Sequence, residues 1–193
     1  MKRSLGASTL VGATPVWVIG TFDREGRPNI MTAAWGGVCC SDPPCVGVSL
    51  RKATYSYGSI VERKAFTVNI PSADQVKETD YAGIASGRNV DKWQIARLTP
   101  KGSDLVDAPY VIEFPLVLEC RLLHTLDLGL HTRFIGEVVD VKVEPSVLAE
   151  DGSLDIEQVD PFFYVPGGRA YYRIGSHLAK AHSVGAELAK NRS

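Results

Sequence analysis

The stretch PVWVIGTFDREGRPNIMTAAW (15–35) decides the fold of this chain. Its first part, 15–22, is rich in β-branched and aromatic residues and predicts a strand. Gly26 and Pro28 mark 23–28 as a turn. The last part, 29–35, predicts a return strand, so the whole stretch is expected to form a β-hairpin.

Further strand patterns follow along the chain. They cover 45–50, 65–70, 115–128 and 131–145, and only Gly129-Leu130 separates the last two. A two-residue connection between long strands predicts a second hairpin. A turn-rich tail at 150–175 contains two shorter strand patterns.

Helical patterns are fewer. We expect a helix over 53–64, with Thr54 as its N-cap, and another over 71–86, where Ser72 and Gln75 have the spacing of a capping box. An amphipathic helix is expected over 176–191, and 87–103 is polar and irregular, typical of a lid or an intersubunit arm. Long strands thus outnumber helices. The expected fold is mainly β, an antiparallel, Greek-key-like barrel with peripheral helices, in a single domain over 1–193.

Composition excludes several classes of partner. The 193 residues are 45% hydrophobic and 22% charged, with a formal net charge of -1. This balance favours neither nucleic acid nor an anionic membrane as a partner. The apolar residues after the initial Lys-Arg pair are interrupted by Gly12, Thr14 and Pro15, which disfavours a signal peptide, and no run of 18 apolar residues occurs. We expect a cytoplasmic protein.

Four cysteines occur, at Cys39, Cys40, Cys45 and Cys120. Adjacent cysteines rarely pair with each other, because the bond would be strained. We interpret them as buried free thiols in a reducing compartment. A redox or metal role for them is the alternative.

The segment SLRKATYSY (49–57) is a candidate anion site. A strand ends at Leu50, two cations follow, and a helix is expected to begin near Thr54. The first turn of a helix offers free N–H groups and partial positive charge, which suit a phosphate. An ordinary strand–helix junction with solvated cations is the competing interpretation.

Small side chains dominate the end of the first hairpin, at Thr32, Ala33 and Ala34. They would let a flat ligand lie against the backbone, with Trp35 as a wall. Equally, they would let a helix pack against the strand. The residues alone leave both interpretations open.

Other reactive side chains form no familiar motif. His124 and His131 have no carboxylate at the spacing of a metal site, so no metal is expected. No G-x-S-x-G sequence is present, so nucleophilic catalysis is not supported.

Four segments in this order, TPVWVIGTFDREGRPNIMTAAW, SLRKATYS, FTVNIPS and HTRFIGEVVDV, resemble the flavin reductase-like family of FMN-binding split barrels. The resemblance runs from about Val11 to Gly175 and is greatest to members of the flavoredoxin type. It implies a homodimer that holds FMN non-covalently near the subunit interface, with electrons exchanged with a redox protein partner or with NAD(P)H.

The resemblance also implies site residues. Those along the isoalloxazine and ribityl are Asn29, Met31, Thr32, Ala33, Ala34 and Trp35. Those around the phosphate are Ser49, Leu50, Arg51, Lys52 and Thr54. Those near the flavin are Asn69, His131 and Phe134, with Ser86 and Lys92 reaching in from the other subunit and Tyr164 as a cover.

Three classes of function follow. An FMN-dependent electron carrier is favoured, with His131 or Lys92 tuning the flavin potential. An NAD(P)H-dependent flavin reductase that supplies reduced flavin is the first alternative. A protein that binds flavin or haem without catalysis, or a structural dimer without ligand, is the second.

Overall fold

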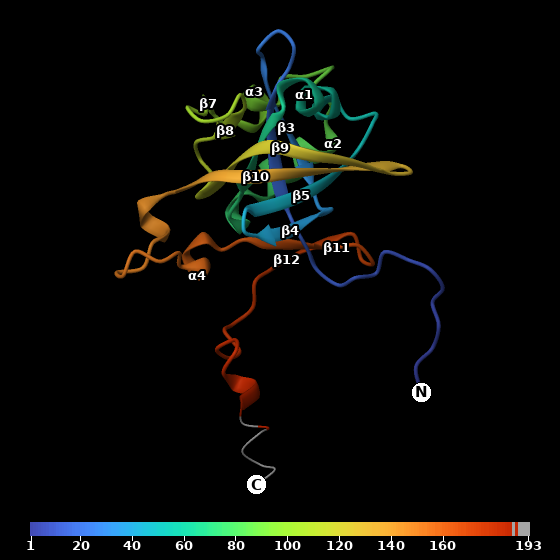
Figure 1. Ribbon diagram of the computed structural model, residues 1–193, viewed down its shortest axis with the longest axis vertical. Coiled ribbons are helices and arrows are strands. Elements are labelled where there is room, and N and C mark those ends of the chain that lie inside the picture. Colours follow the sequence, from blue (N-terminus) through green and yellow to red (C-terminus); the bar gives the residue numbers. More distant parts are fainter. Residues whose placement is uncertain (187, 189–193) are drawn as a thin grey trace.

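The computed structural model describes residues 1–186 and 188, and its centre is a seven-stranded antiparallel sheet in the order β3-β2-β6-β9-β10-β5-β4 (Figure 1). The strands of this sheet are β2 (Trp17–Phe22), β3 (Pro28–Ala33), β4 (Gly36–Ser41), β5 (Pro44–Arg51), β6 (Ala65–Ile70), β9 (Leu116–Leu128) and β10 (His131–Val143). Both predicted hairpins, β2–β3 and β9–β10, are confirmed.

The order of the strands curls the sheet into a barrel. β3 and β4 lie at opposite edges of the sheet, yet only Ala34 and Trp35 separate them along the chain. The two edges must therefore come close together, and the backbone N–H of Ser49 on β5 donates to the carbonyl of Trp35 at 2.9 Å. The predicted antiparallel split barrel is confirmed.

One strand of the barrel was not predicted. The strand expected over 29–35 ends at Ala33, and Gly36–Ser41 forms the separate strand β4. A Cβ atom at Gly36 would lie 2.4 Å from the ring of Trp17, so glycine is required where this indole packs. Two consecutive glycines carry no strand pattern, and the contact that selects one of them is made to a residue far away in the sequence.

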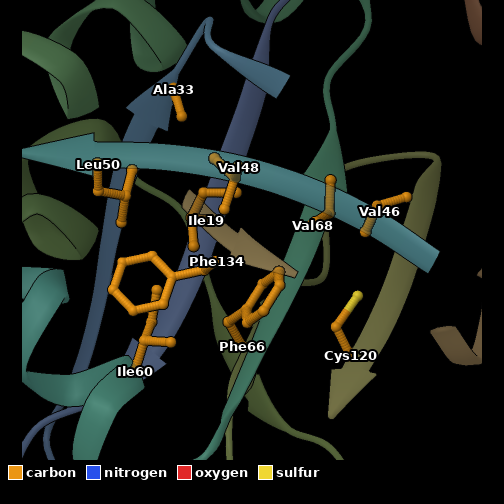
Figure 2. Packing of buried hydrophobic residues seen from close by; sticks show 10 residues of the cluster. All are labelled: Ile19, Ala33, Val46, Val48, Leu50, Ile60, Phe66, Val68, Cys120 and Phe134. Carbon is orange, nitrogen blue, oxygen red and sulfur yellow. The ribbon is translucent and has the colours of Figure 1, made fainter. Parts of the chain in front are cut away.

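The barrel interior is packed with apolar side chains (Figure 2). Val46, Val48 and Leu50 alternate along β5 and point into it, where they meet Phe66 of β6 and Phe134 of β10. This period of two places every second residue of a strand on the core face. The residues between them, Gly47 and Ser49, face away from the core, where the side chain of Arg133 lies over them.

Helices and short strands surround the barrel. They are α1 (Tyr55–Arg63), α2 (Val76–Ile84), α3 (Lys92–Ala96), α4 (Ile156–Val159), three 3₁₀ turns (Ala73–Gln75, Pro145–Val147 and Val184–Ala186), and the strands β1 (Thr14–Pro15), β7 (Pro100–Gly102), β8 (Pro109–Val111), β11 (Phe162–Val165) and β12 (Ala170–Arg173). β1, β11 and β12 form one small sheet, and β7 and β8 form another. None of the described helices is long and apolar enough to span a bilayer.

The starts of the helices agree only in part with the sequence expectations. Ser72 and Gln75 form the predicted capping box. Thr54 occupies the N-cap position of α1, but its hydroxyl donates to the carbonyl of Arg51 at 2.9 Å instead of capping the helix. The segment 87–103, expected to be irregular, contains α3, whose first N–H groups are capped by Asp91.

Two expectations are wrong. No helix forms over 176–183, where the exposed Leu178 packs against nothing, and the 3₁₀ turn at Val184–Ala186 follows; 187 and 189–191 lie outside the described residues. A short helix without a partner for its apolar face is marginal in water. Of the cysteines, Cys45 and Cys120 are buried as expected, but Cys39 and Cys40 are exposed on the edge strand β4.

Candidate functional site

Three adjoining hollows share Tyr55 in their walls, and together we call them the Tyr55 cleft. Their volumes are about 550, 230 and 760 Å³. The smallest lies between β3, the start of α1 and the segment 82–87. Ligand pockets for small molecules typically measure roughly 300–1,000 Å³, so the cleft has room for a cofactor.

Asn29 stands where the first two hollows meet. Its side chain is 5% exposed, and its amide donates to the hydroxyl of Ser56 on α1 at 2.9 Å. Gly87 crosses directly over this amide, since a Cβ there would lie 2.1 Å from the Asn29 Oδ1. The close approach of this backbone therefore shapes the cleft around Asn29.

Lys92 lines the same two hollows from α3 and is 4% exposed. Its Nζ donates to the carbonyls of Ile30, at 2.8 Å, and Ala82, at 2.7 Å. No carboxylate pairs with it among the described residues, and burial lowers its pKa to about 8. Lys92 thus ties β3 to α2 and leaves a poorly compensated positive charge inside the cleft.

A second polar group lies at the outer wall. Asp23, which is 5% exposed, accepts hydrogen bonds from the N–H and Nε of Arg27 and from the hydroxyl of Tyr55, all at 2.7–2.8 Å. Burial by itself would raise the pKa of Asp23, but these hydrogen bonds bring it below its ordinary value. The ring of Tyr55 is held in the cleft by this contact, with the guanidinium of Arg88 5.4 Å from the ring centroid.

Cationic and hydroxyl groups gather where α1 begins. Lys52 and Thr54 line the largest hollow together with Arg27 and Arg88. Lys52 is paired with Asp127 at 2.8 Å, and this contact raises the pKa of Lys52. The first turn of α1 opens into the same space and contributes the partial positive charge of a helix N-terminus.

The cleft brings together six of the residues that the resemblance implies: Asn29, Met31, Lys52, Thr54, Ser86 and Lys92. Ser86 and Lys92 lie beside Asn29 of their own chain. Ser49, Arg51 and His131 lie on the neighbouring strands β5 and β10 outside the cleft walls, and His131 is the cross-strand partner of Arg51. Trp35 also lies outside these walls, in the link between β3 and β4.

The other implied residues lie elsewhere. Ala33, Leu50 and Phe134 belong to the barrel core (Figure 2), and the amide of Asn69 is fully engaged with Val18, Thr67 and Val111. Tyr164 pairs with Thr14 and Tyr171 in the small sheet. Ala34 is half-buried in the link to β4, and the hydroxyl of Thr32 donates to the carbonyl of Thr79, so that α2 packs on this part of β3.

Sequence reasoning missed several residues of the cleft wall: Asp23, Arg27, Tyr55, Gly87 and Arg88. Asp23 and Arg27 were assigned to a turn, and their i,i+4 spacing across that turn was the available signal. No sequence pattern indicates the role of Gly87, because its contact with Asn29 joins segments that are distant along the chain. Among the described residues, no group of three or more His, Cys, Asp or Glu side chains is placed to hold a metal ion.

Comparison with known proteins finds a family model and several solved structures that this chain matches. Residues 12–172 match the flavin reductase like domain. The solved structure of flavoredoxin of Desulfovibrio vulgaris (Miyazaki F) is 56% identical, with a TM-score of 0.91 over 96% of this chain and 100% of that chain. Flavoredoxin from Methanosarcina acetivorans is 30% identical, with a TM-score of 0.87 over 97% of this chain and 98% of that one.

Another relative matches only part of the chain. A protein from Archaeoglobus fulgidus is 33% identical over 115 residues, which make up 60% of this chain and 65% of that protein. The chain therefore spans slightly less than two thirds of the length of this relative.

Proposed function

Because this chain belongs to the family of flavin reductase like domains, we propose that it binds FMN non-covalently and passes electrons through it, in the manner of a flavoredoxin. The observation that carries the proposal is the Tyr55 cleft, with its anion-binding groups at one end and a buried ammonium group at the other. The 56% identity to a flavoredoxin over the whole of that chain supports it.

The donors at the start of α1 suit the phosphate of FMN. Lys52, Thr54 and the first turn of α1 face the largest hollow, and Arg27 and Arg88 line the same wall. Helix N-termini and cationic side chains favour a phosphate by hydrogen bonding and by charge. Ser49 and Arg51 directly precede this group on β5.

The inner part of the cleft suits a flat ring with a polar edge. Met31 and the ring of Tyr55 offer apolar surface, while Asn29 and Ser86 offer polar groups. When bound, FMN supplies the redox chemistry, and the protein supplies position and electrostatics. The task of this chain is therefore to orient the ring and to set the charge around it.

Two cations are candidates for setting that charge. Lys92 holds its ammonium group inside the cleft, and positive charge near the flavin favours the reduced, anionic state. His131, half-buried beside Arg51, is the second candidate. Replacing His131 with Ala should lower the flavin midpoint potential, and an unchanged potential would remove His131 from that role.

We further propose a homodimer. The end of the β9–β10 hairpin projects from the barrel (Figure 1) and exposes Leu126, Leu128 and Leu130 by 55–62%. Apolar side chains gathered on one projection favour an interface. Light scattering should give twice the mass of one chain, and a Leu128→Asp variant should shift the protein toward the monomer.

The size of the largest hollow favours one alternative. Its volume of about 760 Å³ exceeds what a phosphate group fills, so NAD(P)H has room to approach the flavin from solvent. The chain would then be a flavin reductase. A redox protein partner would dock at the same opening if the chain is a carrier.

An absorption spectrum followed by anaerobic addition of NADH or NADPH separates these functions. Flavin bands that persist after nicotinamide addition support the carrier, and bands that bleach support the reductase. Haem bands would replace the proposal with a haem-binding protein. A colourless protein that does not retain added FMN on gel filtration would refute flavin binding.

A further inference from the structure

Three cysteines gather on the edge hairpin β4–β5, away from the groups that line the Tyr55 cleft. Cys39 and Cys40 lie on β4 and are exposed, whereas Cys45 on β5 is 5% exposed. Cys120 is fully buried in the barrel core (Figure 2). All four are free thiols in this structure.

Cys40 and Cys45 are directly opposed in the antiparallel ladder. Opposed residues of this kind have Cα atoms about 4.5–5.5 Å apart, and their side chains stand on the same face of the sheet. A disulfide requires a Cα separation of about 4.4–6.8 Å. The ladder therefore places the Cα atoms of Cys40 and Cys45 within the range of separations that a disulfide spans.

Cys39 is placed differently from Cys40. The register shifts between Val38 and Cys40, so Cys39 lies in a bulge and has no opposed residue on β5. Its sulfur instead accepts a hydrogen bond from Nη2 of Arg133 at 3.5 Å. Of the two exposed thiols, Cys40 alone has a thiol partner across the ladder.

We infer that Cys40 and Cys45 are a redox modification site that closes into a reversible cross-strand disulfide. A peroxide is the oxidant: the sulfur of Cys40 attacks one peroxide oxygen, the O–O bond breaks, and Cys40 becomes a sulfenic acid while the first water leaves. The sulfur of Cys45 then attacks the sulfur of Cys40, the S–S bond forms, and the sulfenic oxygen leaves as the second water. Two thiols have lost two electrons and two protons, and the peroxide has been reduced to two waters.

The exposures of the two residues suit these two steps. Cys40 is open to a dissolved oxidant. Burial raises the pKa of the Cys45 thiol, so Cys45 reacts poorly with reagents from solution. It reacts instead with the sulfenic acid of the adjacent Cys40. An external dithiol reverses the bond by exchange at the exposed sulfur of Cys40.

The position of the bond suits a switch better than a structural clamp. Only residues 41–44 separate the two cysteines, and closing so short a loop removes little entropy from the unfolded chain. The same hairpin begins directly after Trp35 and ends at Arg51. Oxidation would therefore brace β4, the strand that follows the link between the barrel edges, against β5.

The test uses the full-length protein, reduced and then treated with hydrogen peroxide. Thiols titrated after denaturation should fall from four to two. In the tryptic peptide 25–51, which contains all three hairpin cysteines, the disulfide should join Cys40 to Cys45, and dithiothreitol should restore both thiols. Cys39→Ser is the matched control and should lose two thiols as the wild type does.

Cys40→Ser and Cys45→Ala should each lose no thiol pair. A bond between Cys39 and Cys40, a disulfide between two chains, or over-oxidation of Cys40 without a bond would each overturn the inference. The Cys39→Ser variant keeps the test valid if Cys45→Ala fails to fold, because retention of all three of its thiols after peroxide would be equally decisive.

Discussion

Lys92 should make the stability of this protein rise with pH above neutrality. Its ammonium group is 4% exposed and has two carbonyl acceptors but no carboxylate among the described residues. Burial lowers its pKa from 10.5 to about 8 in the folded state. Between these two values the unfolded chain holds a proton that the folded chain has released.

The sign and size of the effect follow from this difference. Stability rises with pH wherever the unfolded state binds more protons. Each pKa unit corresponds to about 1.4 kcal/mol, so the full window corresponds to about 3 kcal/mol in favour of the folded state. Below pH 8 both states are protonated and Lys92 contributes no pH dependence.

The assay compares urea unfolding of the wild type and of Lys92→Met at pH 7, 8, 9 and 10. Any bound flavin is removed first, because a ligand of the folded state would add its own stabilisation. Subtracting the variant cancels the titration of tyrosines and cysteines, and the remaining difference should grow by about 1.4 kcal/mol per pH unit above pH 8.

Lys77→Met, at an exposed position on α2, is the matched control, and its effect should not vary with pH. A difference between wild type and Lys92→Met that stays constant from pH 7 to pH 10 would refute the assignment of Lys92 as a buried, uncompensated cation.

Four further changes test the cleft and the helix beside it. Gly87→Ala should weaken FMN binding at least tenfold while leaving the circular dichroism spectrum unchanged, because its Cβ would lie 2.1 Å from the Asn29 Oδ1; equal affinity would mean that Gly87 does not shape the site. Asp23→Asn should destabilise the fold by about 1.5–3 kcal/mol at pH 7, the range for hydrogen bonds to a charged group. Because the pKa of Asp23 is lowered on folding, this contribution is present above its ordinary value of 3.8 and is lost as pH falls below it, so chemical unfolding of wild type and variant should converge in acid. Gly58→Ala should stabilise the protein by about 0.5–1 kcal/mol, since the glycine lies inside α1 with open space around it and alanine is the better helix former. Thr54→Ala should weaken FMN binding by about 1–3 kcal/mol, and calorimetry that finds no change would place the phosphate elsewhere.

Local patterns were read correctly because their causes are local. The alternation of Val46, Val48 and Leu50, the two-residue link at Gly129 and the capping box at Ser72 each depend on residues a few positions apart. The end of the strand at Ala33 was misread, because the packing of Trp17 against Gly36 joins two different strands. The helix expected over 176–191 does not form over 176–186, because no described element covers the apolar side chain of Leu178.

The sequence by itself determined the mainly antiparallel barrel, both long hairpins and a candidate anion-binding segment at Lys52 and Thr54, because side-chain period and turn chemistry act along the chain. Only the tertiary structure decided which residues share a cleft. Barrel closure brings Asn29 and Ser56 into hydrogen bonding, carries Lys92 to the carbonyls of Ile30 and Ala82, and sets Cys40 opposite Cys45. Burial and proximity arise from contacts between distant segments, and these set the charge of Lys92 and the partner of Cys40.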